Sequence, residues 1–162
     1  MTDVHIVPAR PEDVPTILEL IRGLGEYERL SHEIVATEDT LRKWLFGERP
    51  AAEVVLAYVD TSVVGFALFF HNFSTFLGRP GLYLEDLFVK PEWRGRGIGQ
   101  QLLVHLAELA VERGCGRMEW TVLDWNESAL RFYERMGARV MKEWKLCRLT
   151  GDSLTRVAAG KS

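Results

Sequence analysis

The chain has little of what marks secreted, membrane-spanning or nucleic-acid-binding proteins. Its 162 residues include only two cysteines, Cys115 and Cys147, in no metal-type spacing, so we expect two reduced thiols in a cytoplasmic protein. No apolar run approaches the roughly 18 residues of a membrane-spanning helix, and the first residues lack the basic and apolar regions of a signal peptide. The net charge of −3 gives no global positive field for nucleic acid. We therefore expect one globular domain over residues 1–162, with no membrane or nucleic-acid partner.

Hydrophobic spacing predicts a mixed α/β chain. Strand-like runs cover residues 4–7, 54–59, 63–70, 81–89 and 118–123, and one or two final strands are expected within residues 140–149. Helical spacing covers residues 11–26, a short stretch after Thr37, residues 98–113 and residues 127–136, where Asn126 can act as the cap. The expected order is β-α-α-β-β-β-α-β-α-β-β, an α/β (α+β) fold with a mixed, mostly antiparallel central sheet. The four histidines show no ligand spacing, so no metal is expected.

A basic, glycine-rich turn separates the strand at residues 81–89 from the helix that follows it. The turn reads Arg94-Gly95-Arg96-Gly97-Ile98-Gly99-Gln100, and a strand, a glycine-rich turn and a helix start together suit a phosphate group. A P-loop would end in Gly-Lys-Ser/Thr, and a dinucleotide-binding fingerprint would have its third glycine where Gln100 stands. The pattern that remains is Arg/Gln-x-x-Gly-x-Gly/Ala, which is typical of the pyrophosphate loop of acetyl-CoA-dependent acyltransferases.

With this loop the sequence resembles the GNAT superfamily of N-acetyltransferases from about residue 4 to residue 149. Besides the loop, three segments carry the resemblance: Tyr-Leu-Glu-Asp-Leu-Phe-Val at 83–89, Trp-Asn-Glu-Ser at 125–128 and Phe-Tyr-Glu-Arg-Met-Gly-Ala at 132–138. An early Glu-Tyr-Glu at 26–28 points to the branch of spermidine/spermine (diamine) acetyltransferases and their thialysine-acetylating relatives. The resemblance implies a GNAT fold and acetyl-CoA as the co-substrate.

The donor site that the resemblance implies follows the strand and the loop. Backbone N–H groups of residues 95–100 would hold the pyrophosphate, aided by the helix dipole and by the charges of two arginines. The acetyl and pantetheine arm would pair with the strand at 87–89, where a backbone N–H would polarise the thioester carbonyl. The cofactor-binding residues expected are Leu87, Phe88, Val89, Arg94, Gly95, Arg96, Gly97, Ile98, Gly99, Gln100, Asn126, Ser128, Ala129 and Tyr133.

Two residues are expected to move protons. Tyr133 matches the family's tyrosine, and a phenol with a pKa near 10 can give a proton to a departing thiolate. Glu85 matches the family's substrate-site glutamate and would take the proton of a protonated amine, directly or through water. Alternation along the strand places Glu85 and Asp86 on opposite faces, so the two carboxylates are not expected to act as a close pair.

The acceptor side is expected to be acidic. By resemblance, Tyr27 and Glu28 contact the substrate from the loop after the first helix, with Glu85 and Asp86 on the strand. Glu119, Trp120 and Thr121 are expected to line the acceptor channel, where an aromatic face also favours a cation. Lys142 falls near a position that is acidic in the animal diamine enzymes, which weakens spermidine as a specific acceptor.

The resulting hypothesis is an N-acetyltransferase that moves an acetyl group from acetyl-CoA to a small cationic amine, a diamine, polyamine or lysine analogue, by direct attack in a ternary complex. One alternative keeps the fold and changes the acceptor to a protein lysine or N-terminus, or to an amino-acid or antibiotic amine. A second is an acyl-CoA-binding module without catalysis. The family resemblance also implies a homodimer.

Overall fold

The computed structural model describes residues 2–161 of the chain. These residues form two compact units, one up to Leu123 and one from Asp124 onward. The first unit holds the sheet with three α-helices, and the second holds two further helices. The single domain expected over residues 1–162 thus stays a prediction.

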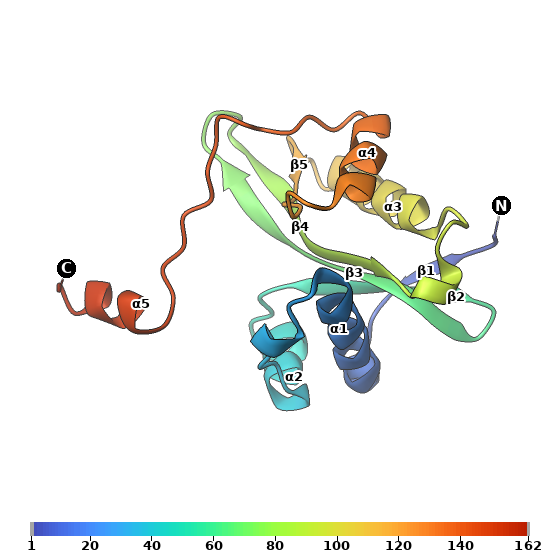
Figure 1. Cartoon of the computed structure of the whole chain (residues 1–162), viewed down its shortest axis with the longest axis horizontal. Coiled ribbons are helices and arrows are strands. Elements are labelled where there is room, and N and C mark those ends of the chain that lie inside the picture. Colours follow the sequence, from blue (N-terminus) through green and yellow to red (C-terminus); the bar gives the residue numbers. More distant parts are fainter. Residues whose placement is uncertain (1, 162) are drawn as a thin grey trace. The chain divides into compact units, whose positions relative to one another are not determined.

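The sheet of the first unit has five strands in the order β1-β2-β3-β4-β5 (Figure 1). The four strands β1 (His5–Pro8), β2 (Glu53–Val59), β3 (Ser62–Ser74) and β4 (Arg79–Val89) are antiparallel. The last strand, β5 (Met118–Glu119), is parallel to β4. The mixed, mostly antiparallel sheet predicted from the sequence is confirmed.

Helices cover both faces of this sheet (Figure 1). On one face α1 (Val14–Glu28) and α2 (Glu38–Phe46) pack against a buried cluster: Ile17, Leu20, Leu24, Leu45, Val54, Leu56, Phe66 and Phe88. On the other face α3 (Ile98–Glu112) buries a stripe that repeats every three or four residues: Ile98, Leu102, Leu103, Leu106 and Ala110. Thr37 caps α2 as expected, since its Oγ1 accepts a hydrogen bond from the N–H of Thr40 at 3.2 Å.

The first helix runs further than expected, so two candidate residues lie on a helix instead of in a loop. We expected α1 to end at residue 26, with Tyr27 and Glu28 in a loop, but the helix continues through Glu28. The helix runs through Gly23 and Gly25, where a side chain would come too close to the Phe88 ring and to Ile34, respectively. The two glycines therefore serve close packing, and Tyr27 and Glu28 are held on the last turn of a rigid helix.

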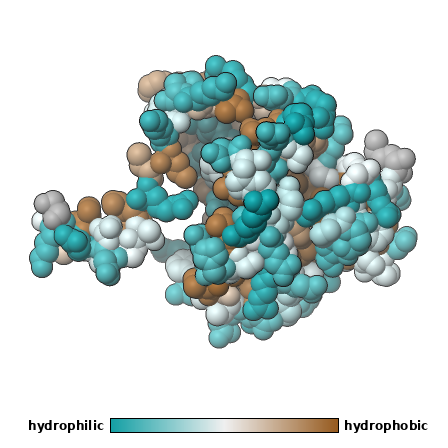
Figure 2. Space-filling model, in the orientation of Figure 1, coloured by the Kyte–Doolittle hydropathy of each residue, from teal (hydrophilic) through white to brown (hydrophobic). Residues whose placement is uncertain are grey.

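The second unit differs most from the sequence prediction. α4 (Glu127–Arg135) is present as expected, but the strands predicted within residues 140–149 are absent from the described chain, and α5 (Gly151–Ala158) was not predicted. The prediction rested on apolar residues such as Val140, Trp144 and Leu146, which are all exposed. A strand needs a neighbour to pair with, and no described strand pairs with this segment. In Figure 2 apolar atoms also lie on the surface of α5.

Two expectations from composition concern membrane-spanning helices and cysteines. Within residues 2–161 none of the helices is long and apolar enough to cross a membrane. Cys115 and Cys147 are both free cysteines in the described chain.

Candidate functional site

The strand β4 contains a one-residue bulge at Glu85. In its register with β3, Leu84 lies opposite Phe69 and Asp86 lies opposite Leu68, so Glu85 is an additional residue without its own partner. A bulge of this kind bends the strand and increases its twist. β5 accordingly pairs with β4 only at Leu82 and Tyr83, which is shorter than the strand predicted over residues 118–123.

Beyond the bulge, β4 offers an unpaired backbone edge within the described first unit. The N–H of Lys90 donates to the carbonyl of Val64 on β3 at 2.8 Å, and the carbonyl of Phe88 lies against Gly65 of β3. Backbone groups alternate sides along an antiparallel strand, so those of Leu87 and Val89 point to the opposite, open edge. Three residues were predicted to pair with the donor arm. The backbone groups of Phe88 point toward β3, and only Leu87 and Val89 present backbone groups at the open edge.

Three carboxylates from β4 and α1 interact at the bulge. Burial and the charge of Glu85 raise the pKa of Glu28 above its usual range. Burial, then the charges of Glu85 and Glu28, raise the pKa of Asp86 from 3.8 to about 7. The alternation from which Glu85 and Asp86 were expected to lie on opposite faces breaks at the bulge, and the charge of Glu85 acts on both Asp86 and Glu28.

Asp86→Asn is expected to stabilise the protein more at pH 8 than at pH 5. Between pH 3.8 and about pH 7, Asp86 keeps its proton in the folded protein and loses it in the unfolded chain. The wild type therefore loses unfolding free energy as pH rises, with a slope approaching about 1.4 kcal/mol per pH unit for one proton. An asparagine does not titrate and removes that slope.

The measurement is thermal unfolding of both proteins from pH 5 to pH 8, with Asp39→Asn, a fully exposed carboxylate on α2, as the control. The difference in Tm should grow with pH for Asp86→Asn and stay constant for Asp39→Asn. A pH-independent difference for Asp86→Asn would show that Asp86 ionises in the folded protein as it does in the unfolded chain.

The glycine-rich loop leads directly from β4 into α3. Gly95 and Gly97 have φ of +76° and +80°, which only glycine adopts without strain, and the space beside each is open for at least 4 Å. The first backbone bond of the helix is from the N–H of Gln101 to the carbonyl of Gly97 at 3.0 Å. The N–H groups of residues 98–100 precede this ladder and lie at the positive end of the helix dipole, as an anion site requires.

The two arginines of the loop are held by protein groups. The Nε of Arg94 donates to the carbonyl of Val89 at 2.9 Å, and its guanidinium lies 4.4 Å from the centre of the Tyr27 ring. The guanidinium of Arg96 lies 4.6 Å from the centre of the Trp93 ring and donates to the carbonyl of Glu92 at 3.3 Å. Both arginines still add positive charge to the loop, but they are oriented by these neighbours.

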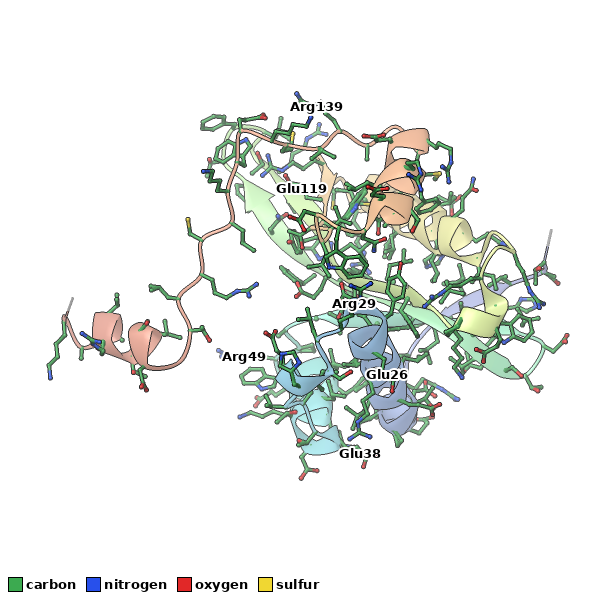
Figure 3. All side chains as sticks on the ribbon, in the orientation of Figure 1. Glu26, Arg29, Glu38, Arg49, Glu119 and Arg139 are labelled. Atoms are coloured by element: carbon green, nitrogen blue, oxygen red, sulfur yellow. The ribbon has the colours of Figure 1, made fainter. Side chains whose placement is uncertain are left out.

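The remaining predicted acceptor residues lie on or just after β5. Glu119, which Figure 3 labels, lies opposite Tyr83 of β4. It forms an ion pair with Arg117 at 3.0 Å. Trp120 and Thr121 follow the strand, with Trp120 half-buried and Thr121 exposed. Glu119 therefore belongs to the same sheet as Glu85 and Asp86, although its own charge is partly balanced by Arg117.

The second unit carries the other predicted residues on and before α4. The Oδ1 of Asn126 caps the helix by accepting a hydrogen bond from the N–H of Ala129 at 3.3 Å, and the hydroxyl of Ser128 donates to the same oxygen at 3.3 Å. Tyr133 lies further along α4, with its ring 5.4 Å from that of Phe132. The cap fixes the residue at which α4 begins, and Tyr133 lies on this helix.

Sequence reasoning missed two features of this site. The bulge has a signal in the sequence: Leu82 and Leu84 occupy even positions, and after two consecutive acidic residues Leu87 and Val89 occupy odd positions. The aromatic neighbours of Arg94 have no comparable signal, since Tyr27 is remote in sequence. Within the described residues, no group of three histidine, cysteine or acidic side chains could hold a metal ion.

Comparison with known proteins agrees with this geometry. The model of the acetyltransferase (GNAT) family matches residues 18–138. Thialysine N-epsilon-acetyltransferase from Bos taurus is 39% identical over 99% of this chain and 100% of that protein. L-ornithine N5-acetyltransferase from Arabidopsis thaliana is 38% identical over 92% of this chain and 85% of that protein. An integron cassette protein from V. cholerae has a TM-score of 0.78 and 31% identity, covering 98% of both chains. The chain therefore belongs to the acetyltransferase (GNAT) family and is an N-acetyltransferase.

Proposed function

We propose that this enzyme transfers the acetyl group of acetyl-CoA to a primary amine of a small cationic substrate, such as a diamine, a polyamine or a lysine analogue. The observation that carries the proposal is the bulge in β4, which joins an open backbone edge to three interacting carboxylates. The family uses acetyl-CoA, and two relatives are named for thialysine and ornithine, which both carry a side-chain amine.

The donor site proposed here uses the loop and the edge of β4. The N–H groups of residues 98–100 would bind the pyrophosphate, since Gly95 and Gly97 leave space beside them. Leu87 and Val89 would pair with the pantetheine arm as a neighbouring strand does, and one of their N–H groups would polarise the thioester carbonyl. Asn126, Ser128 and Ala129 would contact the same arm from the start of α4.

The chemical step proposed is direct attack of the amine on the thioester. The amine must first lose its proton, and Glu85 is the proposed acceptor, directly or through water. The nitrogen lone pair then forms the C–N bond, the C–S bond breaks as the oxyanion collapses, and Tyr133 gives its phenolic proton to the departing thiolate. The nitrogen loses its second proton, which restores the Tyr133 phenol through water, so the products are the neutral amide and the CoA thiol. Neither free cysteine belongs to the proposed site, which favours direct attack over a thioester on the enzyme.

The acceptor proposal rests on charge. Glu28, Glu85 and Asp86 together favour a substrate with positive charge, because burial and then the repulsion between these carboxylates raise the pKa of Glu28 and of Asp86, and a nearby cation would lower both. A cationic amine would supply that balance. Tyr27, Glu119, Trp120 and Thr121 are proposed to line the path of the acceptor.

Glu28→Gln is expected to reduce discrimination between dicationic and monocationic amines by about tenfold, measured as the ratio of their kcat/KM values, because one charge-assisted contact is lost. The comparison uses a diamine and the monoamine of equal length. Glu19→Gln removes an exposed carboxylate from the same helix and should leave the ratio unchanged. An unchanged ratio in Glu28→Gln would favour the alternative acceptors, a protein lysine or an antibiotic amine.

A homodimer is proposed from the second unit. Its residues 140–157 expose Val140, Trp144, Leu146, Leu149, Leu154 and Val157, more apolar surface than a monomer usually leaves in one segment. The β-like pattern of residues 140–149, which pairs with no described strand, suits pairing with a second copy. Sedimentation of the full chain against a chain ending at residue 138 tests this, because only the full chain should dimerise.

A further inference from the structure

We infer that Arg94 is a positioning residue for the acceptor side of the site, and that it acts by bracing Tyr27 against the end of β4. This inference rests on the proposed function. It differs from the donor role that the position of Arg94 in the glycine-rich loop first suggests, in which the guanidinium would contact the pyrophosphate.

Three contacts hold Arg94 in this place. Its Nε donates to the carbonyl of Val89 at 2.9 Å. Its guanidinium lies 4.4 Å from the centre of the Tyr27 ring and 5.4 Å from that of Phe88. A guanidinium over an aromatic face is attracted by the ring, so one side chain links the last turn of α1, the end of β4 and the start of the loop.

The contact with Val89 uses the open edge of β4. The Val89 carbonyl points away from β3, so Arg94 satisfies a backbone acceptor that no described strand reaches. Arg94 thereby occupies the Val89 carbonyl at the end of the open edge. The backbone groups of Leu87 and the N–H of Val89 remain available to a ligand. The planar guanidinium can stack on a ring and donate from Nε at the same time, which a lysine ammonium cannot do.

The contact with Tyr27 connects the brace to the acceptor. Tyr27 immediately precedes Glu28, whose pKa is raised by burial and by Glu85. Tyr27 and Glu28 share the final helical turn of α1, which ends at Arg29 with φ of +61°. The orientation of that turn relative to β4 sets the distance between Glu28 and the carboxylates of the bulge, and Arg94 is a side chain that ties the turn to the strand.

Arg94→Gln is expected to raise the KM for the amine roughly fivefold to tenfold, as loss of one partly exposed cation–π contact implies. The dissociation constant of CoA, measured by calorimetry, should change less than this KM, since the N–H groups of residues 98–100 remain although the loop loses one positive charge. Arg94→Lys keeps the charge and should not restore the KM. Arg96→Gln is the matched loop arginine, and it should weaken CoA binding more than it affects the KM for the amine.

Two results would overturn the inference: weaker CoA binding by tenfold or more in Arg94→Gln with an unchanged KM for the amine, or full restoration by Arg94→Lys. A double-mutant cycle with Tyr27→Leu gives a readout that needs no turnover. Thermal unfolding of the two single variants and the double variant should show losses that do not add, because both remove one contact. Additive losses contradict the brace, whereas non-additive losses in an enzyme that acetylates no amine would leave the brace standing and refute the proposed function.

Discussion

Tyr133→Phe is expected to lower kcat by about 10²- to 10⁴-fold, the usual contribution of a positioned general acid. The substitution removes only the phenolic oxygen, so the α4 helix, its Asn126 cap and the ring contact with Phe132 at 5.4 Å all remain. KM values for both substrates should change little, because the proton is needed only as the thiolate leaves. Steady-state rates of CoA release from acetyl-CoA in the presence of the amine give the measurement.

The pH profile separates this role from simple packing. If Tyr133 protonates the thiolate, the alkaline fall of the wild-type rate should disappear in Tyr133→Phe along with most of the rate. Phe132→Leu changes the neighbouring ring and serves as the control for disturbance of the helix. Full turnover with an unchanged pH profile in Tyr133→Phe would remove the acid from the proposed mechanism.

Gly97→Val is expected to raise the KM for acetyl-CoA by roughly tenfold to hundredfold. Gly97 has φ of +80° at the residue before α3, and a β-branched residue must leave that conformation or bear about 1–2 kcal/mol of strain. Either outcome moves the N–H groups of residues 98–100, and the new side chain occupies the open space beside the loop. Initial rates at varied acetyl-CoA and saturating amine measure the effect.

Gly114→Val is the matched control for this substitution. Gly114 follows the other end of α3 with φ of +74°, and the space beside it is likewise open for at least 4 Å. The substitution should lower the Tm by a similar amount and leave the KM for acetyl-CoA unchanged. Equal effects of the two variants on that KM would mean that the loop acts only through the stability of α3.

The sequence predicted much of the first unit because its signals are local. The alternating strands, the cap at Thr37, the start of α3 after Gly97 and its stop at Gly114 each depend on neighbours within a few residues. The glycine-rich loop belongs to the same class, since positive φ and a free helix start require particular residues in order.

The features that escaped prediction depend on residues distant in sequence. The helical spacing ends at residue 26, but the helix continues to Tyr27 and Glu28, and only the structure shows that Gly23 and Gly25 allow the close approach of Phe88 and Ile34. The interaction of Glu85, Asp86 and Glu28 needs the register between β3 and β4, which alternation alone places wrongly. The segment at residues 140–149 has the residue pattern of a strand but no described strand to pair with. The strand predicted there from its β-propensity therefore does not form in the described chain.

The central claim is that this enzyme acetylates the primary amine of a small cationic substrate with acetyl-CoA. Its most direct test is the initial rate of the wild-type enzyme with acetyl-CoA across diamines, polyamines, thialysine, ornithine, aminoglycosides and lysine-containing peptides, with mass spectrometry of the products. The account predicts the highest kcat/KM for a small amine with at least two positive charges, and a product acetylated at one primary amine. Preference for a peptide or an aminoglycoside, or binding of CoA without turnover of any amine, would contradict it.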